Sequence, residues 1–393
     1  MSEALLVRFA ARVAAGIDSP VGAAYARLPT RAGRGPLLDL AQAAPAYPPA
    51  PEVVEHVTAV AHDPRGAAYA AQAGLGHLRE AFAADLVEDY GGGRLESDDV
   101  VVTAGCNQAF CLVAATLTEP GDEVVTPRPV YFNHEMWLRM HGVVPVIAEP
   151  GPDLVLRAAD VEPLITDRTR AVVVVTPGNP TGVVVPPDEL AALAALARRH
   201  DLALVLDETY RSFRDDPAPP HRLFADPDWR DTVVSLHSFS KDLALPGYRV
   251  GAVVGAPELR RDVMKLLDCV AIGAPRIGQE AAWAGLTKAR DWRAERAAEV
   301  AGRRAAFTTT LAERPGGVEV LTCGGFFAWV RHPFDRPTPD VVADLLTEQD
   351  VLVMPGTDFQ SRDDGTMRVS VGNLGLEALD DLAERLTTFG SGR

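Results

Sequence analysis

The chain has 393 residues, 47% of them hydrophobic and 23% charged, so it is long enough to form a large domain and a smaller one. Its 38 basic and 54 acidic residues give a net charge of −16, without a stripe of Lys and Arg. This acidic balance argues against nucleic acid as a partner.

The chain carries no apolar run of membrane-spanning length and no signal-peptide cleavage pattern, so we expect a cytoplasmic protein with no membrane partner. Its four cysteines lack the CxxC spacing of redox and zinc sites. We therefore expect reduced thiols, with neither a disulfide framework nor a metal site.

Short apolar runs alternate with longer stretches of helical spacing through the middle of the chain. In chain order the predicted strands are "DDVVVTAG", "DEVVTPRP", "RAVVVVTPGNP", "DLALVLDET" and "DTVVSLHS". This rhythm predicts an α/β fold with a mainly parallel sheet of the seven-stranded type, covered by helices on both faces. The run "RVGAVVG" fits a neighbouring strand of either direction.

The pattern changes from about residue 286, where a long Arg/Ala-rich helical stretch precedes strand-like "GGFFAWVRH", a helix at "DVVADLLTEQ" and strand-like "MRVSVGN". These elements predict a second, smaller α+β domain. We assign residues 48–285 to the large domain, and residues 1–47 and 286–393 to the small one. The Pro-rich stretch "APAYPPAPEV" is expected to cross between them in an extended conformation, because of its prolines.

Polar residues follow several predicted strands at the point where each strand ends. They are Gly105, Asn179, Asp207, and the group Ser238, Ser240 and Lys241. Each alone fits a helix cap or a turn, but the carboxyl ends of parallel strands meet at one edge, where ligands bind in open α/β sheets. The helix that starts at "GCNQ" would offer free N–H groups to a phosphate.

Lysine occurs only three times in the chain, at Lys241, Lys265 and Lys288. The last two lie in amphipathic helical patterns typical of a solvated surface, whereas Lys241 follows a strand beside two serines. A phosphate site next to a lysine and an aspartate suits a cofactor with a phosphate, an aldehyde and a basic ring nitrogen. Pyridoxal 5'-phosphate has all three.

Five motifs carry a resemblance to a known family: "TPGNPTG", "LDETY", "SFSKDLALPGYRVG", "GGFFAW" and "MRVSVG", in this order. With them the chain resembles the fold-type I pyridoxal-phosphate enzymes of the class I/II aminotransferase group, over nearly its whole length. The resemblance implies an aspartate-aminotransferase-like fold, pyridoxal 5'-phosphate as cofactor and a homodimer.

The resemblance also implies roles for individual residues. Lys241 would bind the cofactor covalently and move a proton, and Asp207 would pair with the ring nitrogen. Asn179 and Tyr210 would hydrogen-bond the ring's phenolic oxygen, and Tyr131 would stack on the ring unless it is a core aromatic. The residues implied for the phosphate are Gly105, Cys106, Asn107, Ser238, Ser240 and Arg249, with Tyr69 reaching across from the partner subunit.

Arg368 would clamp the substrate carboxylate through a two-point contact, beside Asn179. The expected reaction moves an amino group between an L-amino acid and a 2-oxo acid by a ping-pong mechanism. The alternative is other chemistry with the same cofactor, such as a β/γ-elimination lyase, a cyclase or an oxidase-type enzyme. A non-enzymatic DNA-binding sensor is disfavoured by the acidic charge.

Two departures from the family pattern are expected to alter the substrate side. Gln360 in "VMPGTDFQ" stands where many members have Phe-Gly. The segment "LAQAAPAYPPAP", residues 40–51, replaces a Gly-bearing pattern near the substrate carboxylate. We therefore expect a backbone approach to the site to be lost there.

Overall fold

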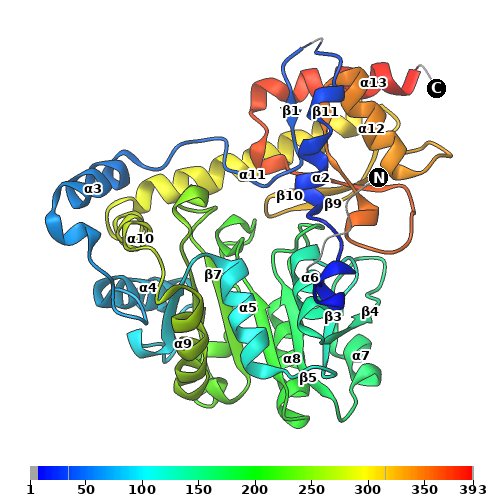
Figure 1. Cartoon of the computed structure of the whole chain (residues 1–393). Helices are drawn as coiled ribbons and strands as arrows, with labels where there is room; N and C mark the ends of the chain where they lie inside the picture. Colours follow the sequence, from blue (N-terminus) through cyan, green and yellow to red (C-terminus); the bar gives the residue numbers. More distant parts are fainter. Residues whose placement is uncertain (1–7, 34, 315, 392–393) are drawn as a thin grey trace.

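The protein is described by a computed structural model covering residues 8–33, 35–314 and 316–391. Residues 1–7, 34, 315 and 392–393 of the predicted small domain lie outside these ranges. A seven-stranded sheet forms the larger part of the molecule (Figure 1). In spatial order its strands are β2 (Val100–Thr103), β8 (Gly251–Val254), β7 (Val233–Ser238), β6 (Ala203–Asp207), β5 (Thr169–Val175), β3 (Glu123–Pro127) and β4 (Val144–Ala148).

All neighbouring strands of this sheet pair in parallel except at β8, which runs antiparallel to both β2 and β7. The continuous valine run of β5 is explained by burial on both faces, since Val172 and Val174 pack on one side and Val173 on the other. The mainly parallel, helix-covered sheet confirms the predicted fold class. β4 was not predicted.

Helices cover both faces of the sheet. One apolar layer contains α5 (Cys106–Leu117), α6 (Phe132–His141) and α9 (Pro257–Ala271). The other contains α4 (Gly76–Asp89), α8 (Pro187–Arg199) and α10 (Arg276–Lys288). None of the helices in the described ranges is both long and apolar enough to cross a bilayer.

A smaller antiparallel sheet of order β12-β13-β10-β9 lies above the large one in Figure 1, and a two-stranded β1-β11 pair lies near it. Their bounds are β1 (Leu38–Asp39), β9 (Glu319–Gly324), β10 (Phe327–Arg331), β11 (Val351–Leu352), β12 (Met354–Pro355) and β13 (Thr366–Val369). Helices α12 (Thr338–Gln349) and α13 (Leu379–Ser391) pack against these strands in a separate core. The domain boundaries themselves stay a prediction.

The long predicted helix is interrupted at Ala289, where α10 ends and α11 (Arg290–Glu313) begins. α11 runs along the junction of the two sheets in Figure 1, with Trp292 packed on the large core and Phe307 in the small one. The Pro-rich crossover is extended only to Ala50, because α3 (Pro51–His62) starts with a proline at its first position. Proline is tolerated there, since its missing N–H would have no helical partner.

Candidate active site

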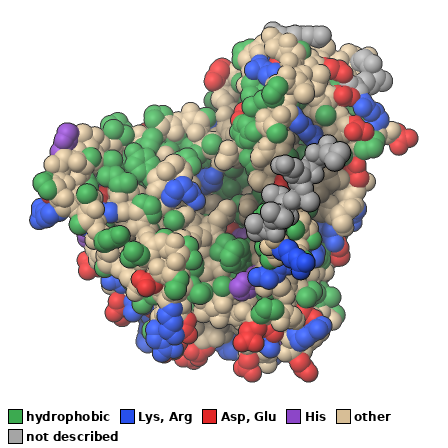
Figure 2. Space-filling model, in the orientation of Figure 1, with side chains coloured by type: hydrophobic (Ala, Val, Ile, Leu, Met, Phe, Trp, Pro, Cys, Tyr) green, Lys and Arg blue, Asp and Glu red, His purple; other side chains and the backbone are tan. Residues whose placement is uncertain are grey.

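A pocket of about 650 Å³ lies at the carboxyl edge of the large sheet, where the two parts of the molecule meet. Figure 2 shows the surface hollowed at this junction. Every predicted site residue except Gly105 and Tyr69 lines the pocket. Those that do are Cys106, Asn107, Tyr131, Asn179, Asp207, Tyr210, Ser238, Ser240, Lys241, Arg249 and Arg368.

The start of α5 forms one end of the pocket. Gly105 precedes this helix with φ of +92°, and no side chain caps the helix N-terminus. A Cβ at Gly105 would lie 2.5 Å from Nη2 of Arg249, so only glycine fits here. Arg249 donates from Nη2 to the carbonyl of Ala104, at 3.1 Å. This places a guanidinium beside uncapped N–H groups, a suitable cradle for an anion.

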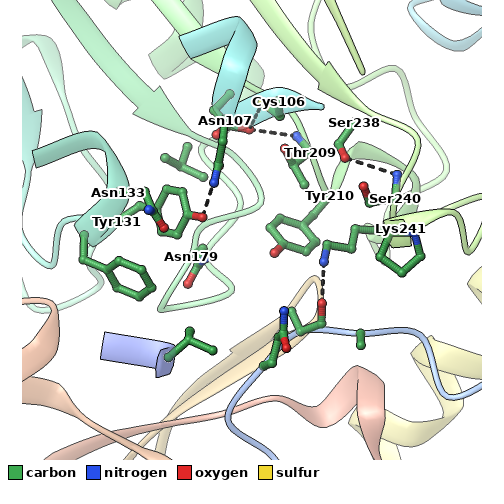
Figure 3. Close-up of a pocket in the computed structure, with 18 of the residues that line it drawn as sticks. Cys106, Asn107, Tyr131, Asn133, Asn179, Thr209, Tyr210, Ser238, Ser240 and Lys241 are labelled. Atoms are coloured by element: carbon green, nitrogen blue, oxygen red, sulfur yellow. Dashed lines mark hydrogen bonds between the residues drawn. The ribbon is translucent and has the colours of Figure 1, made fainter. Parts of the chain in front are cut away.

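Ser238 and Ser240 lie beside this cradle, at the end of β7 (Figure 3). The backbone N–H of Ser240 donates to Oγ of Ser238 at 3.1 Å, which fixes the turn between strand and lysine. Both hydroxyls line the pocket and can donate to an anion held by α5.

Asp207 lies at the end of β6 with its carboxylate buried. Oδ1 accepts from the backbone N–H of Thr209 at 3.1 Å and from the thiol of Cys106 at 3.4 Å, and Oδ2 lies 3.3 Å from Nε2 of His134. Burial acts to raise the pKa of Asp207, but the interactions with His134 and Thr209 outweigh it, so the pKa lies below its usual value. The carboxylate is therefore ionised at neutral pH.

Sequence reasoning missed His134 and Thr209. His134 stacks on Phe110 with ring centroids 3.8 Å apart and is as buried as the carboxylate it faces. It lies three residues after Tyr131, which immediately precedes α6, and the two rings meet edge to face with centroids 5.0 Å apart. That spacing was the signal available in the sequence.

Tyr131, Asn107 and Tyr210 surround the middle of the pocket (Figure 3). The Tyr131 hydroxyl donates to Oδ1 of Asn107 at 3.3 Å. Burial raises the pKa of Tyr210 well above its usual value, and Tyr131 adds to the effect, so the phenol stays protonated as a hydrogen-bond donor.

Lys241 reaches into the pocket from the turn after β7, on the opposite side from Tyr131 (Figure 3). Its Nζ donates to the carbonyl of Ala43. Burial, together with the positive charges of Arg368 and Arg249, lowers the pKa of Lys241 to about 8. Lys241 thus gives up its proton more readily than a surface lysine does.

Arg368 projects from β13 and is only 2% exposed. Nη1 donates to Oδ1 of Asn179 at 2.8 Å, and Nη2 donates to the carbonyl of Ala41. Its guanidinium lies between the rings of Phe327 and Phe359, 4.8 and 4.9 Å from their centroids. Burial lowers its pKa to about 10, so the group stays charged at neutral pH.

The two departures from the family pattern act differently from what was expected. The backbone of residues 41–43 does approach the site, since its carbonyls accept from Arg368 and Lys241. Gln360 is buried and donates from Nε2 to Oδ1 of Asp364 at 2.8 Å. Gln360 does not line the pocket, and its amide also donates to Oγ1 of Thr366 at 3.2 Å, so it holds the loop before β13.

Tyr69 lies outside the pocket with 81% of its surface exposed. It belongs to the segment between α3 and α4. Because Tyr69 does not line the pocket of its own subunit, its predicted role depends on a partner subunit.

The pocket fits a molecule with an anionic group at one end, a basic ring nitrogen and an aldehyde. The uncapped start of α5 and Arg249 suit the anion, the ionised Asp207 suits the protonated nitrogen, and the readily deprotonated Lys241 suits the aldehyde. Fold and pocket together define a fold-type I pyridoxal-phosphate enzyme.

Comparisons with known proteins agree. Residues 35–386 match the family model "Aminotransferase class I and II". An aromatic aminotransferase of Arabidopsis thaliana is 31% identical over 360 residues, covering 89% of this chain and 88% of that protein. An arginine–pyruvate transaminase of Pseudomonas aeruginosa is 33% identical over 303 residues, covering 75% of each.

Among solved structures, the aspartate aminotransferase from Thermus thermophilus, with maleate, superposes with a TM-score of 0.89 at 27% identity. The match covers 98% of this chain and all of that one. The chain belongs to the class I and II aminotransferase family. It is an aminotransferase with pyridoxal 5'-phosphate as cofactor, and it moves an amino group between an L-amino acid and a 2-oxo acid in a ping-pong cycle. The alternative of elimination, cyclisation or oxidation is not favoured by these relatives.

Proposed function

We propose that Lys241, Asp207 and Arg368 carry out this transamination from three positions in one pocket. The observation that carries the proposal is that all three side chains line the same pocket, although they come from separate elements. When bound, pyridoxal phosphate supplies an aldehyde and an electron-withdrawing ring. Lys241 would hold the cofactor covalently, and its Nζ would move the proton at the substrate α-carbon.

The other pocket residues orient the two ligands. Arg368 binds the substrate carboxylate with Asn179 beside it, because a guanidinium matches a carboxylate with two parallel hydrogen bonds. Asn179 and Tyr210 would donate to the phenolic oxygen of the ring, and Tyr131 would stack on the ring face. The donors that would hold the phosphate are Gly105, Cys106, Asn107, Ser238, Ser240 and Arg249.

We further propose a homodimer in which Tyr69 reaches the phosphate of the partner's cofactor. Tyr69, Val270 and Ile272 are exposed large hydrophobic side chains. Their segments are neighbours, since the Gln72 side chain donates to the Met264 carbonyl of α9. Figure 2 shows hydrophobic side chains gathered over the left-hand part of the molecule, where α3 and α10 lie. Burial of such a surface favours association.

The proposed domain division is 48–285 for the cofactor domain, with 1–47 and 286–393 as the small domain. A cytoplasmic location is proposed because the four cysteines are free thiols, which suit a reducing compartment.

The decisive test compares Lys241→Ala with Lys265→Ala. Lys265 is an exposed lysine paired with Asp262 at 2.7 Å, so its loss removes a lysine without touching the pocket. In wild type and Lys265→Ala, borohydride reduction should fix the cofactor to a peptide containing residue 241, and amino acids should discharge the cofactor absorbance. Lys241→Ala should show neither. Cofactor fixed to another lysine in Lys241→Ala, with normal turnover, would sink the assignment.

A further inference from the structure

The pocket continues past Arg368 toward the N-terminal helix α2 (Pro20–Ala26). Among the residues that the structure describes, the side chains that form this wall are neutral. They are Ser19 and Val21 at the start of α2, Gln42 and Ala44 of the crossing segment, and Phe132 and Asn133 of α6. We call them the α2 wall. Asn133 lies beside Tyr131, across the pocket from Lys241 (Figure 3).

The α2 wall rests on an apolar cluster. Phe132 is buried and packs on Phe359 with ring centroids 5.4 Å apart, and Val21 is packed against the same cluster. Phe359 is also one of the two rings that hold the Arg368 guanidinium. Apolar surface therefore continues from the carboxylate clamp to α2.

The charged side chains that line the described part of the pocket lie outside the α2 wall, and each has another partner or role. Asp207 contacts His134 and Thr209, Arg249 lies at the anion cradle, and Arg368 and Lys241 flank the substrate's carboxylate and amine. With its carboxylate at Arg368, a substrate would place its side chain against the adjoining apolar surface, which includes Val21 and Phe132. A second carboxylate in that position would lose water without gaining a cation from the α2 wall.

We propose that the amino-acid substrate has an uncharged, largely apolar side chain that lies against the α2 wall, with Val21, Phe132 and Asn133 as specificity-determining residues. This inference rests on the proposed role of Arg368 as the clamp for the α-carboxylate. Val21 and Phe132 supply the apolar contact. The Asn133 amide accommodates a polar tip, as a phenol or a thioether would present.

The test measures how fast each amino acid discharges the absorbance of the purified holoenzyme. Leucine, methionine, phenylalanine and tyrosine are compared with aspartate and glutamate. The neutral group should react with kcat/KM at least about 100-fold above the dicarboxylates, because burying an unpaired carboxylate is costly. A wild-type preference for aspartate or glutamate would overturn the inference while leaving the transaminase function standing. Discharge by no amino acid at all would contradict the proposed function itself.

Substitutions in the α2 wall give an independent readout. Val21→Arg should raise kcat/KM for aspartate at least about tenfold relative to leucine, since it brings a cation to the wall. Val184→Arg is the matched control, because Val184 is an exposed valine outside the pocket and the ratio should not move. An unchanged ratio in a folded Val21→Arg enzyme would count against the inference.

A second variant covers the case in which Val21→Arg does not fold. Asn133→Asp keeps the size of the side chain but adds a negative charge to the wall. It should improve arginine or lysine as amino donors about tenfold relative to leucine, and should slow aspartate further. Equal effects on all donors would place Asn133 outside the side-chain site and refute its assignment.

Discussion

The two ends of the pocket are built in different ways. At the cofactor end, Asp207 and Ser238 lie on adjacent strands whose register pairs Asp207 with Leu236. At the carboxylate end, Arg368 comes from β13 of the small sheet and bonds to Asn179 of the large unit and to the backbone of Ala41.

The positions of Asp207 and Ser238 are set within one sheet. The position of Arg368 is set where three segments that are distant in the sequence meet. The spacing of Asp207 and Ser238 is set by the hydrogen-bond ladder between β6 and β7. The position of Arg368 depends instead on how the smaller antiparallel sheet packs on the part of the molecule that contains the seven-stranded sheet. Substitutions at the cofactor end should therefore change the chemistry, whereas those at the carboxylate end should change the binding of substrate.

Asp207→Asn is the strongest way to test the cofactor end. A unit charge pair at about 4 Å contributes roughly 4 kcal/mol at an effective dielectric near 20. We therefore expect the rate of the half-reaction to fall about 10³-fold, at one decade per 1.36 kcal/mol. Stopped-flow absorbance with a saturating amino donor measures this rate.

The concentration of amino acid at half-maximal rate should stay within about threefold in Asp207→Asn, because Arg368 is untouched. Asp262→Asn, at an exposed carboxylate paired with Lys265, is the control. A loss of less than tenfold in Asp207→Asn would contradict its pairing with the ring nitrogen.

Arg368→Lys tests the carboxylate end. Lysine keeps the charge but cannot make two parallel hydrogen bonds to a carboxylate. KM for the amino donor should rise about 10- to 100-fold, while the absorbance of the bound cofactor stays the same. Arg362→Lys, at an exposed arginine, should leave KM unchanged. A changed cofactor spectrum with normal KM would contradict the conclusion that Arg368 affects substrate binding and not the cofactor.

The same contrast explains how much the sequence could predict. Gly105, Asp207, Ser238 and Lys241 each follow an apolar run, so their meeting at one sheet edge could be predicted from strand ends alone. The fold class followed from the same alternation of strands and helices.

The contacts that the sequence did not indicate depend on tertiary packing. The Ala43 carbonyl reaches Lys241 from 198 residues away, and a backbone group in an Ala/Pro-rich segment carries no signature. His134 faces Asp207 only because α6 packs against α5, where His134 stacks on Phe110. Arg368 was found by resemblance, since one arginine among many has no distinguishing local pattern.

Tyr69→Phe tests whether the cofactor end is completed by a second subunit. Loss of one hydrogen bond to the phosphate should weaken cofactor retention about tenfold, as measured by dialysis against cofactor-free buffer. The sedimentation of the variant should match that of the wild-type dimer. Full retention of the cofactor by Tyr69→Phe, or a wild-type enzyme that sediments as a monomer, would show that Tyr69 of a second subunit does not contribute to the cofactor site.

The pH dependence of cofactor loading gives the smallest effect and links the two ends. Only the neutral amine of Lys241 attacks the aldehyde, so the loading rate of cofactor-free enzyme should rise with pH to a plateau above about 8. With a pKa of about 8, roughly a tenth of Lys241 is neutral at pH 7.

Arg368→Gln removes a positive charge that disfavours the ammonium form of Lys241. The Lys241 pKa should therefore rise, the midpoint of the loading profile should move to higher pH, and loading at pH 7 should slow a few-fold. Stopped-flow absorbance from pH 6 to 10 measures both profiles. Arg362→Gln should not shift the midpoint. An unchanged midpoint in Arg368→Gln would show that burial alone sets the Lys241 pKa, and that the charge of Arg368 does not affect it.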